Sequence, residues 1–183
     1  MPAAALALRG RHNLYNSLAA AVAARVMDVR SEIVRESLAT FSGVPHRLEL
    51  VGEHQGVRFV NDSKATNVNA VWYALESFDR EKVILIAGGR DKGNDYSALR
   101  DLVATRTRGV VAIGESAKKV MRDLGSVAPR SVEADDMADA VRCAAALAEP
   151  GDVVLLSPAC ASFDQYDNYE HRGDVFRAAV NAL

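Results

Sequence analysis

Polar side chains gather in one short stretch of this sequence, "NDSKATN" at residues 61–67. A carboxylate, a lysine, two hydroxyls and two amides stand between a β-rich run that ends at Val60 and a helical pattern that begins at Val68. Starting that helix needs only one capping residue. A lysine beside hydroxyls at a helix N-terminus can hold a carboxylate or a phosphate. The structural alternative is that Thr66 or Asn67 caps the helix and Lys64 points to solvent.

Two further stretches carry the same kinds of groups, "AGGRDKGNDY" at 87–96 and "SPACASFDQYDNY" at 157–169. In the first, the glycines could serve only a turn with positive φ. In the second, Ser162 could cap a helix and Cys160 could be a small buried residue. The sequence contains no G-K-[ST] and no G-x-S-x-G, so it predicts neither a P-loop nor a serine nucleophile elbow.

The segments that must position these stretches alternate between strand and helix patterns. The strands expected at 83–87, 109–113 and 153–156 are continuous apolar runs, which is typical of strands covered on both faces. "RLELVGEHQGVRFVND" predicts a hairpin that turns near 54–56, and a short strand is expected near 131–133. Helices are expected at 68–78, about 95–105, 116–124, 135–148 and about 168–182.

This alternation predicts a Rossmann-like, doubly wound α/β domain with a mostly parallel sheet. Ligands bind such sheets at the carboxyl ends of the strands. The stretches that begin at 61, 87 and 157 all follow strands. We therefore expect them to lie together on one edge of the sheet.

The first 43 residues show helical patterns and no strand pattern, unlike the rest of the sequence. Leu14, Leu18, Val22 and Val26 are spaced four apart, and a second helix is expected at 31–41 with Ser31 as a capping-type residue at its start. Gly43 and Pro45 then interrupt the pattern. We expect a helical unit over 1–43 and the α/β domain over 44–183.

Composition excludes several classes of function. The 183 residues are 49% hydrophobic with a net charge of -2, which gives no electrostatic reason to bind nucleic acid or a membrane surface. No apolar run reaches the roughly 20 residues of a membrane span, and "MPAAALAL" lacks the basic start of a secretory signal. Cys143 and Cys160 have no CxxC partner and the four histidines show no ligand spacing. We expect reduced thiols, no metal site and a cytoplasmic protein.

Several motifs together, "GRHNLYN", "G-x-PHR", "NDSKATN", "AGGRDKG" and "LLSPACASFDQYDNYEHRGDVF", resemble the Mur ligases of bacterial peptidoglycan synthesis. The resemblance runs from about residue 9 to the end and is to the branch that adds D-glutamate. It implies that 44–183 is the C-terminal Rossmann-like domain and that 1–43 is the end of the central ATPase domain. The family's P-loop, its uridine-nucleotide domain and the modified lysine that helps hold magnesium have no counterpart in this chain.

The activity that the resemblance implies is a ligase reaction of cell wall biogenesis. ATP phosphorylates the carboxylate of UDP-MurNAc-L-alanine, and the amine of D-glutamate attacks the resulting acyl phosphate. The implied cofactors are ATP and Mg²⁺ in the full-length enzyme. We expect this chain alone to be inactive and to bind neither tightly.

Site residues are implied position by position. Those that match D-glutamate contacts are Lys92 and Thr66 at one end, and Ser162 with the main chain of Tyr169 at the other. Those that match ATP contacts are Asn13 and Asn16 near adenine, Asp62 at the ribose and Arg47 at the phosphates. Lys64 and His46 are the implied catalytic residues, and no metal ligand is implied. Tyr169 stands where the family often has phenylalanine.

The chemistry of these groups agrees with a dicarboxylate ligand, because D-glutamate needs an anion-binding group at each end. Two alternatives stay open at this point. One is a stand-alone Rossmann-like module that binds a nucleotide or an amino acid, which the missing P-loop favours. The other is a related ligase of the folylpolyglutamate type, against which the loop sequences speak.

Overall fold

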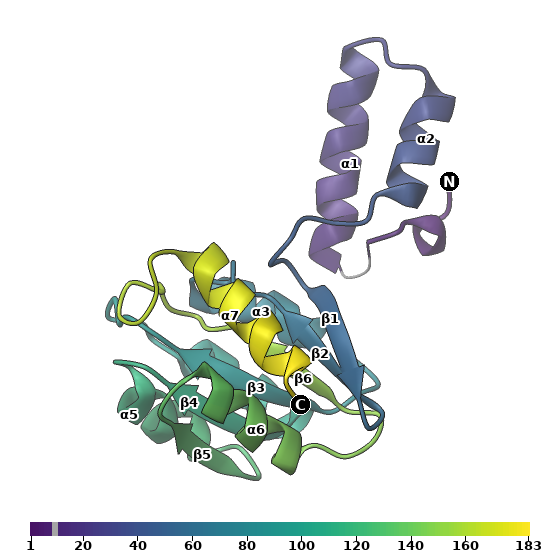
Figure 1. Cartoon of the computed structure of the whole chain (residues 1–183). Coiled ribbons are helices and arrows are strands. Elements are labelled where there is room, and N and C mark those ends of the chain that lie inside the picture. The colour runs from purple at the N-terminus through teal and green to yellow at the C-terminus, as the bar shows by residue number, and fades with distance from the viewer. Residues whose placement is uncertain (9–10) are drawn as a thin grey trace. The chain divides into compact units, whose positions relative to one another are not determined.

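The computed structural model describes residues 1–8 and 11–183, and it divides into two compact units, Met1–Val44 and Pro45–Leu183. The first unit contains a 3₁₀ turn at Ala3–Ala5 and the helices α1 (Arg11–Val26) and α2 (Ser31–Thr40) (Figure 1). Gly10 of the motif "GRHNLYN" lies outside the described residues.

The first unit contains both expected helices but differs from the prediction at Ser31. The N-cap of α2 is Arg30, while Ser31 is the first helical residue and its hydroxyl donates to Glu32 at 2.8 Å. Leu18, Val22 and Val26 are 54%, 64% and 78% exposed, so the unit does not bury this apolar row of α1 by itself.

The second unit is built on a six-stranded sheet in the order β1-β2-β6-β3-β4-β5. The strands are β1 (Glu49–His54), β2 (Val57–Asn61), β3 (Val83–Gly88), β4 (Thr107–Ile113), β5 (Ser131–Ala134) and β6 (Val153–Leu156). Strand β1 is antiparallel to β2, and every other neighbouring pair is parallel. The predicted mostly parallel, doubly wound sheet is therefore confirmed.

Helices cover both faces of this sheet (Figure 1). On one face lie α3 (Val68–Glu76), α4 (Arg100–Arg106) and α5 (Ala117–Val120), and on the other lie α6 (Met137–Leu147) and α7 (Tyr169–Asn181). Two expected helices are less regular than predicted. The one near 95–105 begins as a 3₁₀ turn at Ser97–Leu99, and α5 continues as a π-helical turn over Met121–Gly125.

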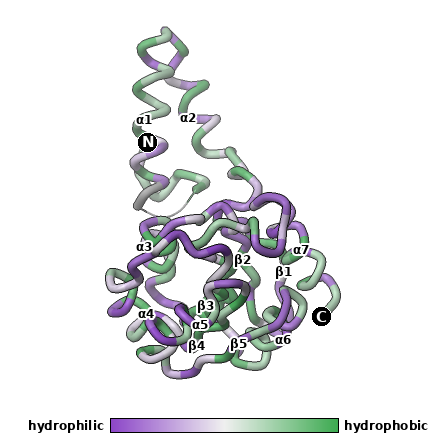
Figure 2. The backbone as a smooth tube through the Cα atoms, turned by 90° about the vertical axis from the view of Figure 1, so that its left-hand side faces the viewer, coloured by the Kyte–Doolittle hydropathy of each residue, from purple (hydrophilic) through white to green (hydrophobic). Residues whose placement is uncertain are grey.

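The core explains why the central strands are apolar at every position. Val83 and Leu85 of β3 pack under α3, α4 and α5, whereas Ile84 and Ile86 pack under α6 and α7. All four are fully buried, and Figure 2 shows β3 as a hydrophobic segment. Burying one such side chain contributes about 1.5–3 kcal/mol to stability. Alternate side chains of β3 therefore stabilise the packing of the helices on both faces of the sheet.

The hairpin and the crossover decide which loops become neighbours. A two-residue turn joins β1 to β2, with Gln55 and Gly56 at φ 51° and 77°, as the primed hairpin turns require. Strand β6 then lies between β2 and β3. Because of this order, the loop after β6 lies between the loops after β2 and β3.

Candidate functional site

Three loops meet at the carboxyl edge of the parallel strands, as the strand pattern predicted. The loop after β6 is bonded to the loop after β2 through Ala159 N–H, which donates to Ala65 O at 2.9 Å. It is bonded to the loop after β3 through Arg90 N–H, which donates to Ala161 O at 2.9 Å. Lys92 and Ser162 therefore lie on the same edge of the sheet.

Three of the predicted ligand-binding side chains remain unpaired there. Lys92 is exposed, Thr66 is half-buried and Ser162 is 2% exposed. Within the described part of the chain, none of the three side chains forms a hydrogen bond or an ion pair. The helix cap that was the alternative role for this loop is supplied by Asn67, whose side chain accepts from Ala70 N–H at 2.9 Å. Thr66 thus remains available to a ligand.

Asp62 is a buried carboxylate that ties the loop after β2 to its neighbours. It is 7% exposed, and it accepts bonds from Ser157 Oγ at 2.9 Å and from Leu48 N–H at 3.3 Å. Burial raises the pKa of Asp62 to about 7, against the opposite effect of these bonds and of Arg47. The ribose contact implied for Asp62 stays a prediction.

Arg172 is a central residue of the site that the sequence reasoning missed. It is 1% exposed, and its guanidinium donates to Ser63 Oγ at 2.9 Å, to Ser63 O at 2.8 Å and to Cys160 O at 3.1 Å. Burial lowers the pKa of Arg172 to about 10. One signal could have identified it, since Arg172 is spaced by four from Phe176 and Val180 on the buried face of α7. Arg172 of α7 therefore joins the loop after β2 to the loop after β6.

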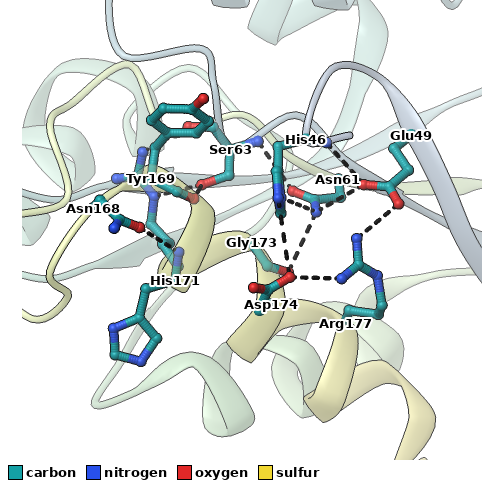
Figure 3. Close-up of polar contacts among 11 residues, drawn as sticks. His46, Glu49, Asn61, Ser63, Asn168, Tyr169, His171, Gly173, Asp174 and Arg177 are labelled. Carbon is teal, nitrogen blue, oxygen red and sulfur yellow. Dashed lines mark hydrogen bonds and ion pairs between the residues drawn. The ribbon is translucent and has the colours of Figure 1, made fainter. Parts of the chain in front are cut away.

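His46 is held by side chains from β1, β2 and α7 (Figure 3). Its ring Nδ1 lies 3.0 Å from Asn61 Nδ2, and the main-chain N–H of His46 donates to Glu49 Oε2 at 2.8 Å. Arg177 donates to the other oxygen of Glu49 at 2.8 Å. A Cβ on Gly173 would lie 2.2 Å from His46 Nδ1, so this close approach requires a glycine. The catalytic role implied for His46 stays a prediction.

Lys64 and Tyr169 are in contact across the site. Lys64 Nζ lies 3.7 Å from the centroid of the Tyr169 ring, and Ser63 Oγ donates to Tyr169 O at 2.8 Å. Tyr169 is the first residue of α7, where helix geometry leaves the N–H without an intrahelical acceptor. That N–H can bind an anion, as implied for the main chain of Tyr169.

The predicted ATP contacts are divided between the two units. Arg47 is exposed and belongs to the second unit, as does Asp62. Asn13 is half-buried and Asn16 is exposed, and both belong to the first unit. Seven of the predicted residues come together at the carboxyl edge of the sheet, namely His46, Asp62, Lys64, Thr66, Lys92, Ser162 and Tyr169.

The described residues contain neither a cluster of metal ligands nor a membrane-spanning helix. No group of three or more histidine, cysteine, aspartate or glutamate side chains there could hold a metal ion. None of the helices within that part of the chain is long and apolar enough to cross a membrane. Both cysteines are free, and Cys160 is fully buried with the Tyr96 hydroxyl at 3.2 Å from its sulfur.

Curated relatives are similar to this chain over most or all of its length. Residues 46–160 match the family described as Mur ligase, glutamate ligase domain. The UDP-N-acetylmuramoylalanine--D-glutamate ligase of Salinibacter ruber is 65% identical over 183 residues, which are 100% of this chain and 40% of that protein. The ligase of the same name from Porphyromonas gingivalis is 50% identical over 175 residues, 96% of this chain and 39% of that protein. The chain thus spans about two fifths of the length of these relatives.

Solved structures agree on the fold. The UDP-N-acetylmuramoylalanyl-D-glutamyl-2,6-diaminopimelate--D-alanyl-D-alanyl ligase of Acinetobacter baumannii superposes with a TM-score of 0.73 at 17% identity, over 97% of this chain and 38% of that chain. The family match covers more than half of the chain, from His46 before β1 to Cys160 in the loop after β6. The chain belongs to the Mur ligase family and carries its glutamate ligase domain.

Proposed function

We propose that this chain is the C-terminal part of an ATP-dependent ligase that adds D-glutamate to UDP-MurNAc-L-alanine in peptidoglycan synthesis. The observation that carries the proposal is the set of unpaired groups Lys92, Thr66 and Ser162 on one edge of the sheet. The names of the relatives support the same reaction.

D-glutamate fits this edge because it carries two carboxylates. Lys92 and Thr66 bind one carboxylate, and the hydroxyl of Ser162 with the N–H of Tyr169 binds the other. The N-terminus of α7 adds a partial positive charge to the second position. A charge-assisted hydrogen bond of this kind contributes about 1.5–3 kcal/mol, so Lys92 is the strongest single contact.

Lys64 acts beside the amino group of the bound amino acid. The attacking amine has to be uncharged, and a lysine ammonium nearby disfavours its protonation. His46 lies next to this position with its ring 6.0 Å from that of Tyr169. These groups position the reactants and stabilise developing charge, which are the main sources of catalysis in such a transfer.

ATP contacts come from both units. Asn13 and Asn16 bind the adenine, and the exposed Arg47 binds the phosphates. Asp62 already accepts two hydrogen bonds, and its carboxylate has further lone pairs for a ribose hydroxyl. The phosphate-binding loop and the Mg²⁺ ligands belong to parts of the ligase outside this chain. The exposed row on α1 fits a helix that packs against those parts.

The partners of the complete protein are therefore small molecules, namely ATP, D-glutamate and the uridine-linked acceptor. We propose no nucleic-acid or membrane partner and a cytoplasmic location, where both nucleotides are available. The chain alone lacks a P-loop and does not turn over ATP.

The test is made on the full-length ligase that contains this chain. ADP release is measured with UDP-MurNAc-L-alanine and one amino acid at a time: D-glutamate, L-glutamate, D-alanine or meso-diaminopimelate. Turnover that requires both the acceptor and D-glutamate supports the proposal. Equal turnover with another amino acid, or ADP release that needs no acceptor, overturns it.

A further inference from the structure

Tyr169 contacts the 61–67 loop through its side chain as well as through its main chain. Its ring lies beneath the ammonium of Lys64, with 3.7 Å from Nζ to the ring centroid. Its carbonyl accepts the hydroxyl of Ser63 at 2.8 Å. The family resemblance assigns Tyr169 only a main-chain contact with D-glutamate, so the ring is left without a role.

We propose that the ring of Tyr169 is a positioning element that holds the ammonium of Lys64 in the site. This role deepens the proposed ligase function and rests on it. An ammonium over an aromatic face is attracted by the ring quadrupole. Tyr169 thus acts through Lys64, and its ring does not itself touch a reacting atom.

The kind of contact matters for the charge of Lys64. Within the described residues Lys64 forms no ion pair, and its ammonium contacts the Tyr169 ring. The pKa of Glu170 is lowered first by a hydrogen bond with the Tyr169 side chain and to a smaller extent by the charge of Lys64, and Lys64 and Glu170 form no ion pair. A carboxylate partner would neutralise the ammonium, whereas an aromatic ring restrains it and leaves its positive charge available to an anionic ligand.

The ring is itself fixed in place. The Ser63 hydroxyl that bonds Tyr169 O also accepts from the buried Arg172 at 2.9 Å. The His46 ring meets the Tyr169 ring edge-on, with an interplanar angle of 83°. Asn168 caps α7 directly before it by accepting from His171 N–H at 2.7 Å. Tyr169 is therefore a rigid platform, while a lysine side chain alone has many rotamers.

The first test is spectroscopic and uses the 183-residue chain without substrates. The side-chain CH₂ signals next to Nζ of Lys64, assigned with Lys64→Arg, are expected upfield of those of the exposed Lys92 because they lie over the ring. Tyr169→Phe keeps this shift and Tyr169→Leu removes it. Phe163→Leu removes an exposed ring from the same edge and serves as the matched control, with the Lys64 shift retained. An unshifted Lys64 signal in the unaltered chain overturns the proposal.

The second test is a double-mutant cycle in the full-length ligase. Tyr169→Leu is expected to lower kcat/KM for D-glutamate by about 2- to 30-fold, the range of one cation–π contact. Tyr169→Phe restores most of that loss, and adding Tyr169→Leu to Lys64→Ala causes little further loss. Fully additive effects overturn the role of the ring. If the unaltered ligase shows no turnover with D-glutamate, the proposed function is wrong. The spectroscopic result then still shows whether Lys64 contacts the Tyr169 ring.

Discussion

The hydroxyl of Ser157 donates a 2.9 Å hydrogen bond to the carboxylate of Asp62, although the two residues are 95 positions apart. Ser157 follows β6 and Asp62 follows β2, so the bond joins two of the loops that form the candidate site. Asp62 is nearly buried, and its pKa is raised to about 7. The site therefore contains a carboxylate that costs stability when it is charged.

Asp62→Asn should stabilise the second unit at neutral and higher pH. The folded pKa is raised from 3.8 to about 7, so between these values the folded chain retains a proton that the unfolded chain loses. The contribution of Asp62 to stability thus falls as pH rises to about 7 and is constant above it. The variant should gain up to about 4 kcal/mol over wild type across this window. Urea unfolding from pH 5 to 8, followed by the single tryptophan Trp72 in α3, measures the difference, and a pH-independent difference contradicts the prediction.

Gly173→Ala should destabilise the chain even though alanine favours helices by about 1 kcal/mol. The new Cβ would lie 2.2 Å from His46 Nδ1 and 2.9 Å from Asn61 Nδ2. Overpacking of this kind costs about 1–3 kcal/mol. His46→Ala removes the closer of these two contacts, so Gly173→Ala should cost less stability in the His46→Ala background than in wild type. Thermal unfolding of the four proteins decides this, and strict additivity would show that the clash is absent.

Arg172→Met should loosen the two loops that Arg172 joins. It leaves three buried acceptors unpaired but also removes a buried charge, for a net loss of about 2–5 kcal/mol. Hydrogen exchange should accelerate at 62–66 and 159–162. The control is Arg108→Met, which removes the ion pair with Asp152 at the opposite edge of the sheet. It should lower stability without changing exchange in those loops, and equal patterns in both variants would contradict the role of Arg172.

Lys92→Ala in the full-length ligase should affect D-glutamate more than ATP. Losing one charged contact lowers kcat/KM for D-glutamate by about 10- to 150-fold. Ser162→Ala should act in the same direction more weakly, whereas Arg47→Ala should lower kcat with little change in the KM for D-glutamate. Lys82→Ala, before β3 at the far edge of the sheet, is the control. Equal changes in the ATP and D-glutamate constants would show that Lys92 does not bind the amino acid.

The 183-residue chain should bind ATP only weakly. Asn13, Asn16, Asp62 and Arg47 offer contacts to adenine, ribose and phosphate, but the chain has no P-loop. We expect a Kd of about 1 mM or weaker, which corresponds to about 4 kcal/mol or less. Isothermal titration calorimetry measures this directly, and micromolar binding would favour a nucleotide-binding module instead.

The sequence by itself determined the elements and the order in which they follow one another. The continuous apolar runs at 83–87 and 153–156 predicted buried parallel strands, because a strand between two helical layers needs apolar side chains on both faces. The hairpin turn near 54–56 was also predicted, because a two-residue turn such as Gln55–Gly56 depends on the φ angles of adjacent residues. These patterns depend on residues close together in the chain, and so did the motifs that indicated the family.

Only the tertiary structure decided how distant side chains meet. Strand β6 lies between β2 and β3, which places Ser157 on Asp62 and lets Arg172 join Ser63 to Cys160. The buried state of Asp62 and of Arg172 follows from that packing, because burial depends on neighbours that a local sequence pattern does not specify. The contact of Lys64 with the Tyr169 ring has the same origin, since it requires the N-terminus of α7 to dock beside a loop about a hundred residues earlier.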